Sequence, residues 1–305
     1  MISNILTVAE QVLILFILIG VGFCTARFKI FNKSSIKRLT DFMLYIVTPA
    51  VIINSFNRKL DMDMLKGLCV VFVAAIGIHL INILISRIFI HDKSEAREKV
   101  LRMSVIFSNC GYMSFPLQEA IFGSDGVFYG AAFVAVFNIV LWTYGEQTMK
   151  GGGISIKKAI LNPGIIGTVI GLVIFFASVP LPNVISSPIS SLAALNTPVA
   201  MVIVGFHLAS AKLNVKGANV WLTLAVRHIV SPLILVFAMI ALGFRSEPTV
   251  VCAVAASAPI AAAVTMFSNK YNADTPLAAS MTSISTLLSI VTMPVIVGAA
   301  QYFCA

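Results

Sequence analysis

Long apolar stretches recur along the whole of this 305-residue chain. A helix of about 20 residues crosses the hydrocarbon core of a bilayer. Because lipid offers no hydrogen bonds to a backbone, only helices and closed barrels span a membrane. The sequence therefore predicts an all-α membrane protein with ten transmembrane helices, at residues 5–26, 36–56, 65–89, 99–122, 126–147, 162–179, 186–210, 218–243, 248–269 and 276–302.

The composition excludes several other classes of protein. Hydrophobic residues make up 59% of the chain and charged residues 11%, with a mean hydropathy of +0.98. A soluble domain of this size would present more charge to water. The formal charge of +9 does not indicate nucleic acid, because the basic residues gather in alternate loops. The first apolar run follows Met1 to Asn4 without a basic leader or a cleavage site, so we expect this helix to be retained.

Enzyme and metal signatures are missing from the sequence. It contains no Gly-x-Ser-x-Gly, no His-Glu-x-x-His and no phosphate-binding loop, and the loops are too short for a nucleotide-binding domain. The five cysteines form neither a metal-binding spacing nor a disulfide framework. We therefore expect a protein that is not an enzyme, is not driven directly by ATP, and carries no cofactor or metal.

Lysine and arginine are divided unequally between the two sets of alternate loops. Sixteen lie in one set and four in the other, and Arg227 lies inside a helix. Because cytoplasmic loops carry the excess of basic residues, the larger set predicts a multi-pass protein of the inner (plasma) membrane with both termini outside. The larger set comprises Arg27, Lys29, Lys33, Lys37, Arg38, Arg87, Lys93, Arg97, Lys99, Arg102, Lys150, Lys157, Lys158, Lys212, Lys216 and Lys270; the smaller comprises Arg58, Lys59, Lys66 and Arg245.

The two halves of the chain align without a gap at an offset of 149 residues. Scarce residue types then recur in step: Gly22 with Gly171, Thr48-Pro49 with Thr197-Pro198, His79 with His228, Ser108 with Ser257, and Asp125 with Asp274. This pattern favours an old duplication, with residues 1–149 and 150–305 as two repeats of five helices. Five is an odd number, so the second repeat must enter the membrane from the opposite side, as an inverted repeat.

Two of the predicted helices contain helix-breaking sequences at matching places in the two halves. Ser108-Asn109-Cys110-Gly111-Tyr112-Met113-Ser114-Phe115-Pro116 interrupts the fourth, and Ala256-Ser257-Ala258-Pro259-Ile260 interrupts the ninth. A helix broken at membrane depth exposes N–H groups that attract anions and carbonyl groups that attract cations. Two such breaks in corresponding segments point to a transporter's binding site, although each alone also fits an ordinary proline kink. The candidate substrate-binding residues are Asn109, Gly111, Tyr112, Ser114, Pro116, Ser257 and Pro259.

Ionisable side chains within the predicted spans are costly, and each is a candidate for ion coupling. The candidates are His79, His228, His207, Arg227 and Glu119. A histidine can couple transport to protons, or it can stay neutral and hydrogen-bonded between helices. Arg227 can neutralise a bound anion or pair with a carboxylate such as Glu119 or Glu146, and we favour pairing. Coupling to Na⁺ would need backbone and amide oxygens, because no acidic pair lies at either break. Thr48-Pro49 and Thr197-Pro198 predict kinks in the second and seventh helices.

The chain resembles the auxin efflux carrier family of membrane transporters, particularly its bacterial malate and malonate permeases. The fourth-helix break is similar to the family pattern Asn-x-Gly-aromatic-x-Gly-x-Pro, with Ser114 where the family often has glycine. Further similar segments are Asn162-Pro163 with Gly171, Pro198-Val199-Ala200 with Gly205-Phe206-His207-Leu208, Ala258-Pro259-Ile260-Ala261, and Ser285-Thr286-Leu287-Leu288-Ser289 with Thr292-Met293-Pro294.

The resemblance implies a fold shared distantly with bile acid:sodium symporters. In that fold helices 1, 2, 6 and 7 form a scaffold, helices 3–5 and 8–10 form a mobile transport core, and helices 4 and 9 cross. It also implies an organic anion as substrate and a homodimer formed through the scaffold. The lack of acidic residues at the ninth-helix break argues against sodium coupling of the bile-acid type.

The sequence thus predicts a secondary active transporter of a small organic anion, working by alternating access. The expected substrate is a carboxylate such as malate or malonate, or an auxin-like acid. Its expected partners are that anion and the lipid bilayer, without nucleic acid. A channel and a membrane metabolite sensor of the same fold are the alternatives. A channel should lack two crossed breaks that seal the midplane, and a sensor should carry a larger cytoplasmic output surface.

Overall fold

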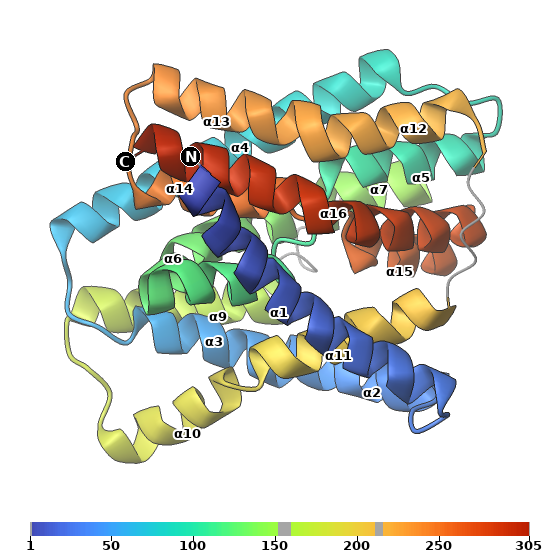
Figure 1. Ribbon diagram of the computed structural model, residues 1–305. Helices are drawn as coiled ribbons and strands as arrows, with labels where there is room; N and C mark the ends of the chain where they lie inside the picture. Colours follow the sequence, from blue (N-terminus) through green and yellow to red (C-terminus); the bar gives the residue numbers. More distant parts are fainter. Residues whose placement is uncertain (1, 152–159, 211–215, 305) are drawn as a thin grey trace.

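The computed structural model describes residues 2–151, 160–210 and 216–304, and Figure 1 shows it as a bundle of helices. The predicted cytoplasmic residues Lys157, Lys158 and Lys212 lie outside the described residues. The helices are α1 (Ile2–Arg27), α2 (Lys33–Phe42), α3 (Thr48–Phe56), α4 (Met62–Phe89), α5 (Glu95–Ile106), α6 (Ser114–Val140), α7 (Glu146–Lys150), α9 (Pro163–Ala177), α10 (Asn183–Ala193), α11 (Asn196–Ser210), α12 (Ala218–Ala225), α13 (Ser231–Ala241), α14 (Glu247–Ser257), α15 (Ala262–Lys270) and α16 (Thr275–Cys304), with π-helical turns η1 (Met43–Val47), η2 (Leu141–Gly145) and η3 (Val226–Val230).

The all-helical class is confirmed, whereas the number of ten spans is not. Two features reduce the number of helices that are long enough to span a membrane. The breaks divide the predicted fourth and ninth helices, and α9 has only 15 residues. Among the described residues, seven helical stretches are long and apolar enough to cross a membrane, and two further apolar helices, Pro163–Ala177 and Glu247–Ser257, are shorter. The seven are Val8–Arg27, Lys33–Phe56, Met62–Phe89, Ser114–Lys150, Asn183–Ala209, Ala218–Ala241 and Thr275–Cys304.

A glycine separates the predicted fourth and fifth helices within α6. Gly123 has φ of 60° and ψ of −143°, a conformation that strongly favours glycine. The helix before it starts at the fourth-helix break, and the helix after it continues through η2 into α7. The predicted boundary between the fourth and fifth helices, at residues 122–126, therefore corresponds to a turn of the chain at one residue, without a long loop.

The predicted proline kinks coincide with departures from α-helical geometry. Before Thr48-Pro49 the chain forms η1, in which the Thr48 N–H bonds to the carbonyl of Met43, five residues back. Proline has no N–H to continue the α-helical ladder, and a π-turn is one way to accommodate it. Ser231-Pro232 follows η3 in the same way. Thr197-Pro198 lies in the first turn of α11, after a turn that separates α11 from α10.

Glycines allow two pairs of helices to approach closely. A Cβ atom on Gly22 of α1 would collide with the backbone of Val202 in α11, and one on Gly205 would collide with the backbone of α1. A Cβ atom on Gly171 of α9 would lie 2.9 Å from the Phe56 ring of α3. At the offset of 149 residues α1 corresponds to α9 and α11 to α3, so each repeat supplies one partner to each pair.

The helices form two groups that meet along α6 and α16 (Figure 1). One group contains α1, α2, α3, α9, α10 and α11, and the other contains α4, α5 and α12 to α16. α6 packs against α4 and α14 in the second group and against α3 and α9 in the first, and α1 also packs along α16. The two breaks lie between helices of this arrangement: residues 107–113 join α5 to α6, and residues 258–261 join α14 to α15.

Replacing Gly22 by alanine should weaken the fold at the contact between α1 and α11. The added Cβ has no room against the Val202 backbone, and overpacking of this kind costs about 1–3 kcal/mol of unfolding free energy. Thermal unfolding of the purified variant in detergent measures the loss. Gly20→Ala is the matched control, because its Cβ position meets no described atom within 4 Å beyond its own stretch of helix. Equal melting temperatures for the two variants would contradict the packing described here.

Candidate functional site

The two breaks predicted from the sequence lie together and pair through their backbones. Ser108 and Ile260 form an isolated antiparallel β-bridge. The Asn109 N–H donates to the Pro259 carbonyl at 2.7 Å, and the Ala261 N–H donates to the Phe107 carbonyl at 3.0 Å. In Figure 1, α5 and α15 lie on one side of this pairing and α6 and α14 on the other, so two helix C-termini and two helix N-termini meet there.

The local sequence explains why both helices stop at these points. Pro259 has no N–H to donate to the carbonyl four residues back, so α14 ends at Ser257. Pro116 lies in the first turn of α6, where its missing N–H costs no helical hydrogen bond. Gly111 has no positive φ, and a Cβ atom there would meet nothing within 4 Å. Gly111 therefore leaves open space beside the break.

The two helices that begin at the breaks have no side-chain caps. The N-cap residues are Met113 for α6 and Ala261 for α15, and neither makes a side-chain hydrogen bond to its helix. By contrast, the Asp61 side chain caps α4. The first N–H groups of an uncapped helix carry partial positive charge and are available to an anion. Both positive helix ends thus point toward the same region.

The candidate side chains divide into two groups at this site. The hydroxyls of Ser114 and Ser257 both donate to the Val254 carbonyl, at 3.4 and 3.3 Å, so they satisfy a backbone group of α14. Asn109 is 8% exposed, and no described residue hydrogen-bonds to its side chain. Tyr112 is half-buried. Asn109 and Tyr112 are therefore the candidate side chains that remain available to a ligand.

Arg227 does not take the partner expected from the sequence. Its side chain is 1% exposed and donates to the Val105 carbonyl at 3.0 Å and to the Ala256 carbonyl. The ion pairs among described residues do not include it. Glu119 is exposed, and the buried Glu146 accepts a hydrogen bond from the Tyr271 hydroxyl. The favoured pairing with a carboxylate is thus replaced by contacts with two main-chain carbonyls at the ends of α5 and α14.

His228 is joined to the ninth-helix break by a chain of hydrogen bonds. The Ile260 N–H donates to the Ser285 hydroxyl at 2.8 Å, and Ser285 lies 2.7 Å from His228 Nε2. His228 Nδ1 lies 3.0 Å from the Thr292 hydroxyl. The Thr292 hydroxyl in turn donates to the Leu288 carbonyl, which leaves its oxygen as the acceptor for Nδ1. This arrangement fits a neutral imidazole that carries its proton on Nδ1.

The other ionisable candidates have different surroundings. His79 is buried, its Nδ1 lies 2.7 Å from the Ala75 carbonyl, and no described residue hydrogen-bonds to Nε2. Its ring lies 6.2 Å from that of Phe107, the C-cap residue of α5 directly before the fourth-helix break. His207 and Glu119 are exposed, and neither has a hydrogen-bond partner among the described side chains. The structure therefore brings His79, His228 and Arg227 to the breaks and leaves His207 and Glu119 at the surface.

Comparison with known proteins places the chain in a family. The family described as membrane transport protein, which is auxin efflux carrier-like, matches residues 7–157 and again residues 147–297. The chain belongs to this membrane transport family. Its double match hints at an internal repeat, and the chain is a multi-pass membrane protein.

Two archaeal relatives support this assignment. The chain is 21% identical over 291 residues to an uncharacterized transporter of Methanothermobacter thermautotrophicus, covering 93% of this chain and 96% of that protein. It is 24% identical over 298 residues to an uncharacterized transporter of Methanocaldococcus jannaschii, covering 92% and 95%. A transport family also agrees with the expectation that the chain is not an enzyme.

Two residues beside the paired breaks of this transporter have roles that the sequence analysis did not assign. Ser285 links His228 to the break, and Gln118 of α6 donates to the Val251 carbonyl of α14 at 3.2 Å. Gly130 provides the room for Gln118, because a Cβ atom there would overlap the amide oxygen. A glutamine inside an apolar run was the available signal. Ser285 gave no such signal, because serines are frequent in the last helix.

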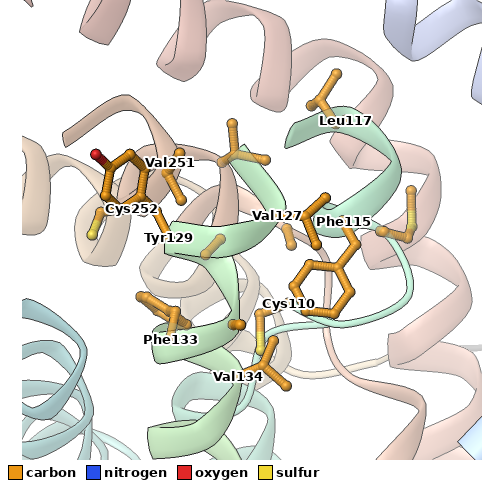
Figure 2. Close-up of a cluster of buried hydrophobic side chains, with 14 of the residues drawn as sticks. Cys110, Phe115, Leu117, Val127, Tyr129, Phe133, Val134, Val251 and Cys252 are labelled. Atoms are coloured by element: carbon orange, nitrogen blue, oxygen red, sulfur yellow. The ribbon is translucent and has the colours of Figure 1, made fainter. Parts of the chain in front are cut away.

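Apolar packing surrounds the start of α6 in the transporter. Figure 2 shows Cys110 close to Phe115 and Val134, with Val127 above them, whereas Val251 and Cys252 of α14 lie farther away beside Tyr129. Cys110 is 1% exposed. It is a small buried residue of the core, and this packing fixes the position of the break relative to α6.

Removing the Ser285 hydroxyl should destabilise the crossing. Ser285→Ala leaves the Ile260 N–H and His228 Nε2 without their partner, and an unsatisfied buried group costs about 1–3 kcal/mol. Ser289→Ala is the matched control on the same helix, because the equally buried Ser289 hydroxyl has the Thr286 carbonyl of its own helix as its one partner among the described residues. Thermal unfolding compares the two. A larger loss in the control would refute the assigned role of Ser285.

Proposed function

We propose that this protein is a secondary active transporter of a small organic anion that works by alternating access. The observation that carries the proposal is the backbone pairing of the two breaks, which brings the uncapped N-termini of α6 and α15 to one place. Their N–H groups and helix dipoles favour a negative ligand. The membrane transport family supports the general activity.

A carboxylate fits the chemistry of the proposed site. Residues 107–113 and 258–261 contain no Asp or Glu that would repel it. The Asn109 amide can donate a hydrogen bond to a carboxylate, and the Tyr112 hydroxyl can do the same. A Cβ atom on the neighbouring Gly111 would meet no described atom within 4 Å, so the chain beside these two residues is not filled. We propose malate, malonate or an auxin-like acid as the substrate class.

The two groups of helices suggest how the site changes its access. We propose that the helices 3–5 and 8–10 predicted from the sequence, which contain the breaks, form the moving core. Helices 1, 2, 6 and 7 form the scaffold, in which the close contacts of α1 with α11 and of α3 with α9 are consistent with a rigid unit. The backbone pairing joins both repeats of the core, so they would move as one body. We further propose an inner-membrane protein with both termini outside, which dimerises through the scaffold.

Replacing Asn109 by alanine should strongly reduce saturable uptake of the substrate into proteoliposomes. Loss of a hydrogen bond to a charged ligand weakens binding by about 10- to 100-fold. Labelled malate, malonate and an indole acid are the test substrates. Asn183→Ala is the control, because Asn183 is exposed at the start of α10. Uptake at the wild-type rate in a folded Asn109→Ala protein would remove the site from this position.

The same vesicles separate the transporter from the two alternatives. A carrier shows uptake that saturates and that is stimulated by unlabelled substrate on the other side of the membrane. A channel shows neither, and a sensor binds the anion without moving it. Either of these results for the wild-type protein would overturn the proposed function.

Coupling to a proton should depend on His228. The hydrogen bonds to Ser285 and Thr292 connect its protonation to the backbone of the ninth-helix break. His228→Gln should therefore remove the stimulation of uptake by an imposed proton gradient while substrate binding is retained. Uptake measured with and without the gradient, beside His207→Gln as an exposed control, tests this. A proton response that persists in His228→Gln would assign coupling elsewhere.

A further inference from the structure

Arg227 lies beside the paired breaks, next to the C-terminal ends of α5 and α14. These helix ends expose carbonyl groups, whereas the N-termini of α6 and α15 expose N–H groups. Arg227 lies in η3, is 1% exposed, and contacts one helix end from each half of the chain. Its two acceptors are the carbonyls of Val105, near the end of α5, and Ala256, near the end of α14. The guanidinium therefore joins the two C-terminal helix ends where they meet.

Both acceptor carbonyls have lost their helical partners because of the breaks. In a continuous helix the Val105 carbonyl would accept from the Asn109 N–H, which here donates to Pro259 instead. The Ala256 carbonyl would accept from the Ile260 N–H, which here donates to Ser285. A buried carbonyl without a partner is costly, so each of these groups needs a donor from another part of the molecule.

The position also suits a positive charge on electrostatic grounds. Helix C-termini carry partial negative charge, and carbonyl groups freed by a break are the ligands that a small dissolved cation would take. Within the described part of the chain, no carboxylate forms an ion pair with Arg227. Nε of the same side chain is buried and has no partner among the described residues. The positive charge of Arg227 therefore faces the negative ends of carbonyl dipoles and no described carboxylate. It contributes positive electrostatic potential where the two breaks pair.

We propose that Arg227 is a tethered cation that takes the place of a dissolved monovalent cation at the two freed carbonyls. It locks the half-helices of the two repeats together and gives the anion site a permanent positive charge. No Na⁺ is then needed at these carbonyls. This inference deepens the proposed function. Its test by anion uptake rests on that function, whereas its test by guanidinium binding needs no transported substrate.

Chemical rescue tests the binding part of the inference. Arg227→Ala should lower the melting temperature of the purified protein, because two carbonyls and a helix-end charge lose their partner. Millimolar guanidinium should raise the melting temperature of this variant, since it fits the space left by the side chain. Urea and tetramethylammonium at the same concentration serve as controls, and Arg245→Ala, at an exposed arginine, should show no rescue. Absence of rescue by guanidinium, with Na⁺ also without effect, would overturn the inference.

Two further variants keep the test decisive if Arg227→Ala does not fold. Arg227→Lys retains the charge and should fold, with uptake independent of Na⁺. Arg227→Met has a similar size without charge, and it should lose at least about tenfold in the initial rate of anion uptake. Uptake by Arg227→Met at the wild-type rate would refute the need for a cation at this position. If the wild-type protein transports none of the test anions, the proposed function fails, whereas the guanidinium rescue still decides the role of Arg227.

Discussion

The backbone pairing between residues 107–109 and 259–261 is the interaction on which the rest of the structure depends. A helix interrupted inside lipid leaves N–H and C=O groups that neither water nor lipid can satisfy. Each break supplies the partners that the other lacks: Asn109 donates to Pro259, and Ala261 donates to Phe107. α6 and α14, which flank the pairing, also pack against each other, and Gln118 of α6 donates to the Val251 carbonyl of α14.

Where the two breaks pair, the C-terminal helix ends have side-chain partners among the described residues and the N-terminal helix ends do not. The carbonyl ends are closed by the chain itself, through Arg227 and through the hydroxyls of Ser114 and Ser257. The N-terminal ends of α6 and α15 have no side-chain caps. This difference gives the region a net attraction for negative charge, which is the physical basis of the proposed anion transport. It also separates the two related histidines: His228 is held in a hydrogen-bonded chain, whereas His79 packs among aromatic rings.

Much of this arrangement could be predicted because it depends on local sequence. Pro259 cannot donate to a helical ladder and Pro116 favours a helix start, so both breaks were visible in the sequence. The number of spans was less predictable, since the breaks divide two of the predicted helices and α9 is short. The partner of Arg227 was mispredicted for a different reason. Charge pairing was assumed, but the acceptors are main-chain carbonyls, and no residue type marks a carbonyl that a break has freed.

The sequence by itself determined an all-helical membrane protein, a repeated pattern across its two halves, and the places where two helices must stop. Those properties depend on hydropathy, proline and glycine, which act on their immediate neighbours along the chain. Only the tertiary structure decided that the two breaks pair, that Ser285 connects His228 to one of them, and that Arg227 closes the carbonyl side. These contacts join residues far apart in the sequence, and their energies come from hydrogen bonds that exist only once the helices have packed.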